Sequence, residues 1–362
     1  MAYIYGKKYS RNEILKKVGD ISQIAGIKRY TLAEGKEKGV EAIDIRTGSG
    51  LSFTILPDRG IDISYAEYKG KPLCWRSSVG DAAPEFFEPE GYGFLRNFFG
   101  GLLTTCGLTY AGHPCMDEGE QLGLHGRINN TPAKNICTEN IWEKDEYILT
   151  VKGKVQETKV FGENILLTRT ITSKLGESKL YLKDEVENLG FEKTPHMVLY
   201  HINIGFPILD NGSRLISPTK IAHPRDKEAE KNAHQYNTFS EPIPKYKEKC
   251  YYHQMKPDKN GFIHAAIINE KFDNNTGLGV YIKYPFSQLP EFLEWKMTGE
   301  GIYVVGIEPS NCYISTRTQL RKEKKLPFLE PGEKKEYDIE IGVLQTNKEI
   351  KEFEDKLKNE EY

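Results

Sequence analysis

Apolar and polar residues alternate with a period of two through most of this 362-residue chain. The pattern is typical of β-strands whose two faces meet different surroundings, because successive side chains point to opposite sides of a sheet. Turn signals such as Thr47-Gly-Ser-Gly and Asp210-Asn-Gly separate the alternating segments. The clearest segments are rich in β-branched and aromatic residues and lie at residues 40–45, 51–55, 147–151, 165–171, 180–186, 279–284, 303–307 and 337–341.

Helical signals occur only near the two ends, where Ser10 with Glu13 and Thr346 with Glu349 have capping-box spacing. Strands and helices do not alternate, and no repeat of 20 to 50 residues is present, so we expect an all-β protein built as a large antiparallel sandwich. We predict a single domain over residues 1–362, with an N-terminal helical and strand extension at 1–30 and a C-terminal helix at 347–362. The polar stretch 224–249 is predicted to be the longest surface loop.

Composition excludes several classes of function. The chain has 50 Lys and Arg residues against 52 Asp and Glu residues, with no basic half, so neither nucleic acid nor a membrane surface is expected as a partner. No apolar run has the length of a signal peptide or of a membrane span, which predicts a cytoplasmic protein. The six cysteines are scattered without a CxxC pair, and nucleotide-binding and metal-binding motifs are missing. We therefore expect no cofactor and no metal.

Two glycine-rich stretches carry polar side chains that suit a ligand site. Residues 91–101 hold Arg96 and Asn97 among aromatic residues, where a guanidinium can bind a hydroxyl or carboxylate or simply pack on phenylalanine. Residues 122–133, LGLHGRINNTPA, hold His125 between two glycines, with Arg127 on the same side by alternation. Glycine permits a sharp turn or the close approach of a ligand. The plainer alternative is a tight loop whose histidine binds a neighbouring carbonyl.

Two further polar groups lie on predicted strands. Alternation places His201 and Asn203 on one strand face, which is unlike core packing. Glu308 is followed by Pro309, which we expect to end the strand and leave the carboxylate half-desolvated at the rim of the sheet, with a raised pKa. The alternative is an ordinary exposed glutamate at a strand end.

These motifs together resemble the aldose 1-epimerase (galactose mutarotase-like) superfamily, in a branch marked by LPDRGIDIS, LTTCGL, GLHGRINNTPA, YHINIGFP and GIEPSN. The resemblance implies a β-supersandwich whose concave face holds a sugar. Carried over by position, it implies Glu308 as the catalytic base, His201 as the acid, and His125 and Arg96 as hydroxyl-binding residues. Ordinary mutarotases place the acid histidine four residues before an asparagine, whereas His201 lies two residues before Asn203. The family's second binding carboxylate has no clear counterpart.

The residues and the resemblance together predict an isomerase that interconverts the anomers of a sugar or sugar derivative. Ring opening needs a base for the anomeric hydroxyl and an acid for the ring oxygen, without a cofactor. Trp295 can stack on the apolar face of a pyranose or belong to the core, and Asn97, Arg127 and Asn203 complete the predicted substrate-binding set. A non-catalytic carbohydrate-binding protein, a keto-sugar isomerase and a purely structural domain are the alternatives. The expected partner is a small carbohydrate, and a homodimer is left open.

Overall fold

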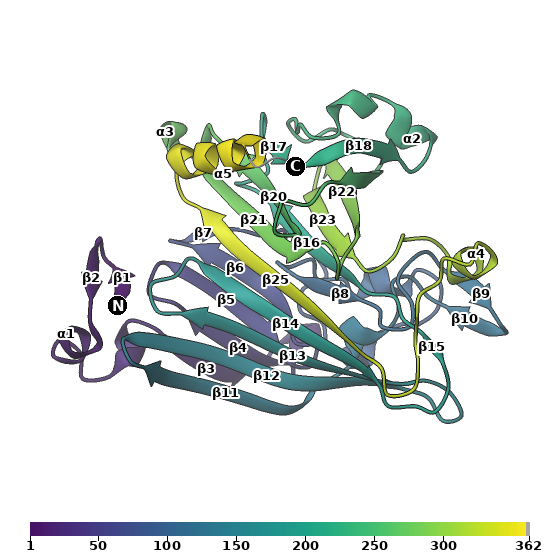
Figure 1. The fold of residues 1–362 in the computed structure, drawn as a ribbon, viewed down its shortest axis with the longest axis horizontal. Helices are drawn as coiled ribbons and strands as arrows, with labels where there is room; N and C mark the ends of the chain where they lie inside the picture. Colours follow the sequence, from purple (N-terminus) through teal and green to yellow (C-terminus); the bar gives the residue numbers. More distant parts are fainter. Residues whose placement is uncertain (360–362) are drawn as a thin grey trace.

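Antiparallel strands dominate the computed structural model, which describes residues 1–359 (Figure 1). In β13, every second residue is buried, so the period of two in the sequence reports one buried face. The largest sheet has eight strands in the order β11 (Lys134–Glu143), β12 (Glu146–Thr158), β13 (Asn164–Lys174), β14 (Lys179–Asn188), β25 (Lys334–Leu344), β21 (Leu278–Pro285), β20 (Phe262–Asn269) and β17 (Arg214–Ile216).

Two smaller sheets form the second layer, on the far side of the eight-stranded sheet in Figure 1. A six-stranded sheet has the order β18 (Thr219–Pro224), β19 (Lys249–Met255), β22 (Glu291–Gly299), β23 (Ile302–Ser310), β16 (Leu199–Gly205) and β8 (Thr104–Cys106). A five-stranded sheet has the order β3 (Gly26–Thr31), β4 (Glu41–Arg46), β5 (Leu51–Leu56), β6 (Asp62–Tyr68) and β7 (Lys71–Pro72). The bridge between Ile63 and Leu103 joins these two sheets, and the main hydrophobic core fills the space between the layers. The predicted all-β sandwich is confirmed.

Shorter elements complete the fold. The remaining strands are β1 (Ala2–Ile4), β2 (Lys7–Tyr9), β9 (Cys115–Asp117), β10 (Glu120–Leu122), β15 (Thr194–Pro195) and β24 (Phe328–Leu329). The helices are α1 (Arg11–Leu15), α2 (Lys227–Glu230), α3 (Phe272–Asn275), α4 (Arg317–Lys322) and α5 (Asn347–Asn359). Short 3₁₀ turns lie at η1 (Ile21–Gln23), η2 (Gly35–Glu37), η3 (Pro84–Phe86), η4 (Gly93–Arg96), η5 (Ile128–Asn130) and η6 (Ala233–Gln235). The capping box of Ser10 and Glu13 is present at α1. The last three residues of the predicted C-terminal helix lie outside the described residues.

Strand β16 is buried along its whole length because it is covered on both faces. Ile202 and Ile204 point into the main core. The intervening His201 and Asn203 point to the opposite side, as strand alternation requires. One strand therefore connects the interior of the sandwich with the surface on which the candidate site lies.

A cluster of ionised side chains, here called the ion cluster, lies wholly inside the sandwich. The guanidinium of Arg169 on β13 donates to Asp184 on β14 at 2.9 and 2.7 Å and to Asp62 on β6 at 2.6 Å. It also donates to the hydroxyl of Thr105 at 2.8 Å, while the hydroxyl of Tyr200 donates to Asp184 at 2.8 Å. Arg169 and both aspartates have no exposed surface. The cluster therefore links strands of all three sheets through charged hydrogen bonds.

The prediction that Pro309 ends its strand is wrong, because β23 continues to Ser310 and Pro309 pairs with Phe292 of β22. Proline lacks an N–H, so a strand tolerates it only where that donor is not needed. The pairing of β23 with β16 runs through Ile307 and resumes only at Ser310. Pro309 therefore lies beside an interruption in the ladder, and Glu308 lies within the sheet instead of at its rim.

The stretch 224–249 is not a structureless loop. It begins at the end of β18, contains α2 and η6, and returns to β19. Lys296 of β22 anchors it by donating to the carbonyls of Gln235 and Thr238, at 2.7 and 2.6 Å. We call residues 225–248 the β18–β19 excursion. Both of its ends lie at the cavity described below.

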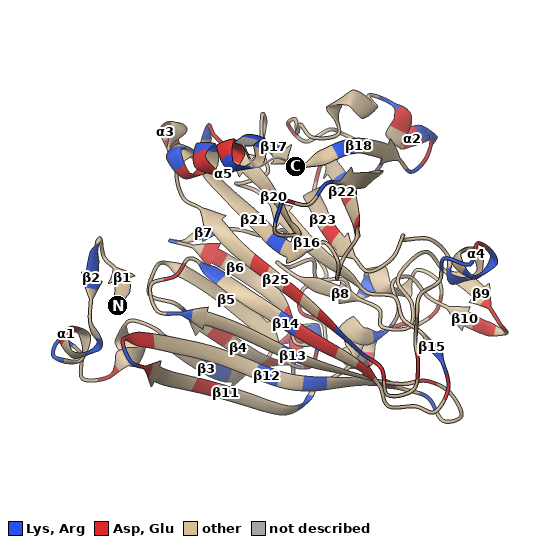
Figure 2. Cartoon of the chain, in the orientation of Figure 1, with Lys and Arg blue, Asp and Glu red and all other residues tan. Residues whose placement is uncertain are grey.

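Charged residues of both signs occur together on the helices α2 and α5, whereas basic residues of α4 face the acidic hairpin β9–β10 (Figure 2). Among the described residues, no helix combines the length and the hydrophobicity that crossing a membrane requires.

Candidate active site

A cavity of about 490 Å³ lies on the face of the six-stranded sheet that is turned away from the main core. Its floor consists of His201 on β16, Glu308 on β23, Trp295 on β22 and Cys250 on β19. Strand register brings them together, since Cys250 pairs with Trp295 and Leu293 pairs with Glu308. The walls are mostly apolar and include Trp75, Tyr92, Phe94, Phe98, Leu124, Tyr252 and Ile314. Such a cavity, apolar with a few convergent polar groups, has the form of a small-molecule site.

The central polar pair of the floor is His201 and Glu308. The Nε2 atom of His201 lies 3.2 Å from Oε1 of Glu308, and the two side chains are 7% and 1% exposed. Their alignment is not that of a hydrogen bond, so Oε1 of Glu308 is buried without a partner. Nδ1, the other ring nitrogen of His201, is buried near Asn203 and has no hydrogen bond of its own. Gly306 makes room for both, because a Cβ at this position would lie 2.2 Å from Oε1 of Glu308 and 3.1 Å from Cε1 of His201.

Burial sets the protonation of this pair. It raises the pKa of Glu308 well above its ordinary value, and the neighbouring Glu248 raises it further. Burial lowers the pKa of His201 to about 3. Both shifts have the same cause, the cost of placing a charge in a site without water. Burial therefore favours the uncharged form of both groups, a carboxylic acid beside a neutral imidazole.

His125 is held beside this pair by its own backbone. Its φ is +59°, and its N–H donates to the carbonyl of Gly112 at 2.9 Å while its carbonyl accepts from the N–H of Gly107 at 3.1 Å. The centroid of its ring lies 6.1 Å from that of His201, and Nδ1 of His125 is buried without a partner. Burial, the largest cause, and the neighbouring His201 lower the pKa of His125 to about 3. Two neutral imidazoles thus face the cavity together.

The glycines beside His125 make room for protein backbone. A Cβ at Gly123 would lie 2.0 Å from the carbonyl oxygen of Pro89, and one at Gly126 would lie 2.3 Å from that of Tyr110. Neither glycine lines the cavity. The structure thus combines the two interpretations of this stretch: the glycines belong to a tightly packed loop, and the histidine between them points to a cavity.

Aromatic side chains enclose the imidazole of His201. The ring centroids of Phe98 and Trp295 both lie 5.3 Å from its centroid, and the ring centroids of Trp75 and Trp295 are 6.3 Å apart. The indole N–H of Trp295 donates to Glu248 at 2.9 Å. Trp295, placed in the substrate-binding set from the sequence, therefore lines the cavity with its polar edge already engaged.

Two of the predicted binding residues are not brought to the cavity. Arg96, at the end of η4, has a side chain that is 73% exposed and lies 3.4 Å from Glu88. Asn97 is fully buried and donates to the carbonyl of Ala83 and to Asn130. The aromatic residues on either side of this pair turn toward the cavity, so the arginine is left to face solvent.

Arg127 and Asn203 also lie outside the cavity lining. Arg127 is 3.7 Å from Glu120 of the β9–β10 hairpin. Asn203 shares a strand face with His201, but the loop at Gly100 and Gly101 covers it, and its amide donates to both glycine carbonyls at 3.1 Å. The backbone N–H of Trp75 donates to the carbonyl of Asn203 at 3.0 Å. Asn203 therefore fixes the wall segments that surround His201.

Sequence reasoning missed the residues that support the walls. Arg59, in the LPDRGIDIS phrase, is fully buried and donates to the carbonyls of Ala82, Asn97 and Asn129 at 2.6 to 2.9 Å. It thereby ties η4, which carries Phe94, to η5, which follows His125. The phrase was recognised as a family marker, but nothing in its spacing reveals which carbonyls a distant fold brings to one guanidinium.

Arg225, Glu248 and His113 also line the cavity without having been predicted to do so. The first two lie at the ends of the β18–β19 excursion, 23 residues apart, so sequence spacing does not connect them. In the described part of the chain, no group of three or more His, Cys, Asp or Glu side chains is arranged to hold a metal ion.

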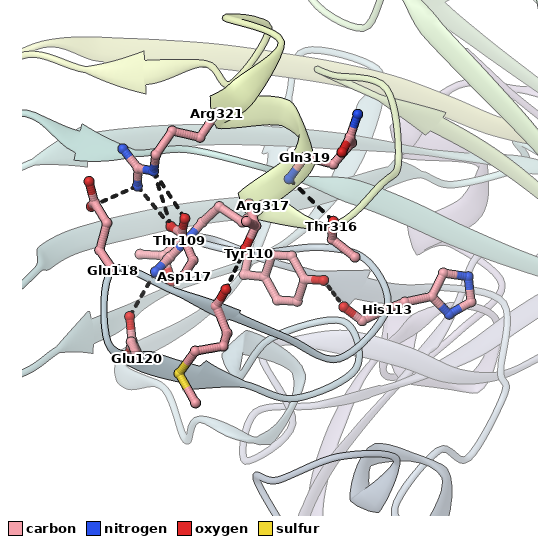
Figure 3. Close-up of polar contacts among 12 residues, drawn as sticks. Thr109, Tyr110, His113, Asp117, Glu118, Glu120, Thr316, Arg317, Gln319 and Arg321 are labelled. Atoms are coloured by element: carbon pink, nitrogen blue, oxygen red, sulfur yellow. Dashed lines mark hydrogen bonds and ion pairs between the residues drawn. The ribbon is translucent and has the colours of Figure 1, made fainter.

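The wall that carries His113 is held from outside by a group of surface ion pairs (Figure 3). Asp117 accepts from Arg317 at 2.7 Å and from Arg321 at 2.8 Å, while Arg317 also donates to Glu120 at 2.8 Å. These contacts join α4 to the β9–β10 hairpin, which lies between His113 and His125 in the chain.

Comparison with solved structures identifies the fold. A protein from Klebsiella pneumoniae subsp. pneumoniae MGH 78578, assigned provisionally as an aldose 1-epimerase, is 27% identical, with a TM-score of 0.87 over 93% of this chain and 88% of that chain. A galactose mutarotase-like protein from Clostridium acetobutylicum is 16% identical, with a TM-score of 0.61 over 90% of this chain and 100% of that chain. Galactose 1-epimerase from Lactobacillus acidophilus NCFM is 13% identical, with a TM-score of 0.58 over 89% of this chain and 100% of that chain. The fold is the galactose mutarotase-like sandwich, which confirms the resemblance stated from the sequence.

Comparison with protein families gives one match, to the family described as a domain of unknown function (DUF4432), over residues 37–343. Comparison with curated protein sequences gives no match.

Proposed function

This chain belongs to the DUF4432 family and has the galactose mutarotase-like fold, and from that premise we propose that it interconverts the anomers of a sugar or sugar derivative. The observation that carries the proposal is the buried pair of His201 and Glu308, which lie 3.2 Å apart with unpartnered polar atoms at the floor of an aromatic cavity. Buried polar atoms without partners are costly, so their presence in a cavity indicates a ligand that satisfies them.

The chemistry matches the spacing of the pair. A hemiacetal opens when a base takes the proton of the anomeric hydroxyl and an acid protonates the ring oxygen. Both oxygens are bonded to the same carbon, so the two protein groups must be neighbours. Ring closure on the other face of the carbonyl reverses the transfers and gives the second anomer.

One proton shared by the pair is enough for a full cycle. Burial favours the form in which this proton is on Glu308 and His201 is neutral. With the proton on His201 instead, the pair is a carboxylate and an imidazolium, the state in which Glu308 acts as the base and His201 as the acid. Hydroxyl groups of a bound sugar stabilise this state by hydrogen bonding to both ions.

His125 has a different part in this proposal. It lines the cavity, and the centroid of its ring lies 6.1 Å from that of His201, so its imidazole is placed to bind a sugar hydroxyl. Trp295 and Phe98 offer aromatic surface to the C–H faces of a sugar ring. His125 therefore orients the sugar, while the pair transfers protons.

The test is anomer exchange measured by saturation-transfer NMR over hexoses, pentoses and deoxy sugars. Glu308→Gln retains the shape of the side chain without its basicity, so exchange should fall by roughly 10²–10⁴-fold. Glu336→Gln, a change on the exposed face of β25, is the matched control and should leave exchange unchanged. His125→Asn should raise KM more than it lowers kcat, whereas His201→Asn should lower kcat.

Each other outcome points to a defined alternative. If sugars bind but no variant changes their exchange, the protein binds carbohydrate without catalysis. If deuterium from solvent enters a carbon of the sugar, the cavity moves a carbon-bound proton, and the protein is a keto-sugar isomerase. If none of the tested sugars binds or exchanges, the proposed function is wrong.

A further inference from the structure

A second polar cluster lines the edge of the same cavity and does not belong to the pair that transfers protons. It consists of Arg225, which follows β18, and Glu248, which precedes β19, with His113 nearby. The N–H of Arg225 donates to the carbonyl of Cys250 at 2.9 Å, which closes the β18–β19 excursion at its base. The two charged residues are thus fixed at one edge of the cavity, although 23 positions separate them in the chain.

The side chains of this cluster are held by defined contacts. The guanidinium of Arg225 donates to Oε1 of Glu248 through Nη2 at 2.9 Å, to Asp226 through Nε at 2.9 Å and to Sγ of Cys250 through Nη1 at 3.0 Å. The second oxygen of Glu248 accepts from the indole of Trp295 at 2.9 Å. Glu248 is therefore fixed by two residues of the cavity lining and presents a carboxylate at its edge.

The charge of the cluster is negative. Arg225 contributes +1, and Glu248 and Asp226, which pairs with Arg225 but does not line the cavity, contribute −1 each, so the three side chains together carry −1. Among the described residues, Arg225 is the only Lys or Arg side chain that lines the cavity. Burial, and then the charge of Arg225, lower the pKa of His113 below its ordinary value, so this imidazole adds no positive charge at neutral pH. An anionic group entering the cavity would meet a carboxylate without an uncompensated cation.

We propose that the Arg225–Glu248 pair determines substrate class, selecting an uncharged sugar that presents hydroxyl groups and rejecting sugars that carry a carboxylate, phosphate or sulfonate. A hydroxyl can donate to Glu248 while it accepts from Arg225, so it matches both partners. An anion can bind the guanidinium only by displacing or approaching Glu248, which costs like-charge repulsion. This inference rests on the proposed function and defines which sugars that function accepts.

The test compares matched sugars and matched variants by ligand-observed NMR at pH 7. The probes are galactose against galacturonate and glucose against glucuronate, which differ only at carbon 6, where the sugar has a hydroxymethyl group and the acid a carboxylate. We expect the wild-type protein to bind the neutral member at least about tenfold more tightly than the acid. Glu248→Gln brings the charge of the cluster from −1 to zero, so the preference should shrink by about tenfold.

The control is Glu270→Gln, which removes the carboxylate from another arginine pair of similar exposure, that with Arg214, away from the cavity. This variant should discriminate like the wild type. Ionic strength gives an independent measurement that needs no variant. Raising the salt concentration from about 0.01 M to about 1 M shortens the screening length from about 30 Å to about 3 Å, so the wild-type preference should weaken.

The outcomes separate this inference from the proposed function. If neutral sugars exchange anomers and uronates bind as tightly as they do, the specificity role is overturned while the function stands. The same conclusion follows if Glu248→Gln folds and leaves the preference unchanged. If Glu248→Gln does not fold, a wild-type preference that is insensitive to salt overturns the inference. If no sugar of either charge binds, both proposals are wrong.

Discussion

Two clusters of buried polar side chains meet at strand β16, one on each face. On the core face, Tyr200 donates to Asp184, which is bound by Arg169. On the other face, the next residue, His201, faces Glu308 across the cavity floor. In the ion cluster, every polar atom of the arginine and its two aspartates has a partner, whereas the cavity pair and His125 leave three buried atoms without one.

This difference separates a structural cluster from a site that accepts a ligand. Buried charges contribute to a stable fold only when they are completely hydrogen-bonded, as in the ion cluster. Unpartnered atoms around a cavity lower stability until a ligand supplies the missing hydrogen bonds. Burial by itself therefore does not indicate function, whereas unused hydrogen-bonding capacity beside a cavity is capacity that a ligand can satisfy.

The largest expected effect tests the structural side of the comparison. Arg169→Met removes the cation shared by Asp62 and Asp184 and leaves two buried carboxylates unpaired. We expect the free energy of unfolding to fall by about 3–5 kcal/mol in urea denaturation. Lys183→Met, which breaks an exposed pair with Glu336, should change it by less than about 1 kcal/mol. Equal losses in the two variants would mean that the ion cluster has no special structural weight.

A second substitution tests the fit of the cavity pair. A Cβ at Gly306 would lie 2.2 Å from Oε1 of Glu308, so Gly306→Ala must displace that carboxyl. Displacement by about 1 Å should lower the rate of anomer exchange by about 10²-fold, while overpacking should lower the unfolding free energy by about 1–3 kcal/mol. Gly19→Ala, which meets no atom within 4 Å, is the control for both measurements. Unchanged exchange in Gly306→Ala would show that the position of Glu308 is not critical.

The pH dependence of stability sharpens the comparison further. The pKa of His201 falls from 6.5 to about 3 on folding, so the unfolded chain binds one more proton between these values. The contribution of the neutral imidazole is complete above about pH 6.5 and is lost as the pH falls. His201→Asn should therefore flatten the rise of unfolding free energy between pH 4.5 and 6.5 by about 1.4 kcal/mol per pH unit.

Glu308 gives the opposite sign in the same experiment. Its pKa is raised on folding, so its contribution to stability is complete below about pH 4.5 and is lost as the pH rises. Glu308→Gln should steepen the rise between pH 4.5 and 6.5. Slopes that match the wild type in both variants would contradict the assigned protonation of the pair.

The smallest expected effect concerns the arginine that the resemblance pointed to. Because Arg96 is 73% exposed and pairs with Glu88 outside the cavity, Arg96→Ala should change KM for a sugar by less than about twofold. A tenfold rise in KM would show that its loop moves over the cavity when a sugar binds. In that case, the hydroxyl-binding role that the resemblance implied for Arg96 would hold.

The fold was predictable because the alternation of apolar and polar residues along a strand shows which of its two faces is buried. The alternation in residues 165–171 reappears as the buried face of β13. Prediction failed at Pro309, since whether a proline interrupts a strand depends on whether the neighbouring strand needs its N–H at that point. That information lies in the pairing with β16 and not near the proline.

The candidate site was predictable to the extent that its residues carry local signals. His201 and Glu308 lie in distinctive phrases on strands, and strand register brings them together. Arg225 and Glu248 lie in a polar stretch that looks like an ordinary surface loop, and only the return of the chain to β19 makes them neighbours. Arg96 shows the converse, because a recognisable motif does not determine which side chain of a short turn faces inward.

The double coverage of β16 has a consequence for how substrate preference can diversify among related proteins. Any substitution that reshapes the cavity floor at His201 acts on a strand whose next residue, Tyr200, belongs to the ion cluster. Such changes carry a penalty in folding and should be rare on evolutionary timescales. Residues 225–248 reach the same cavity from outside the strands and enter the main core through Phe239, so new specificities should arise by mutation, insertion or deletion elsewhere in this stretch.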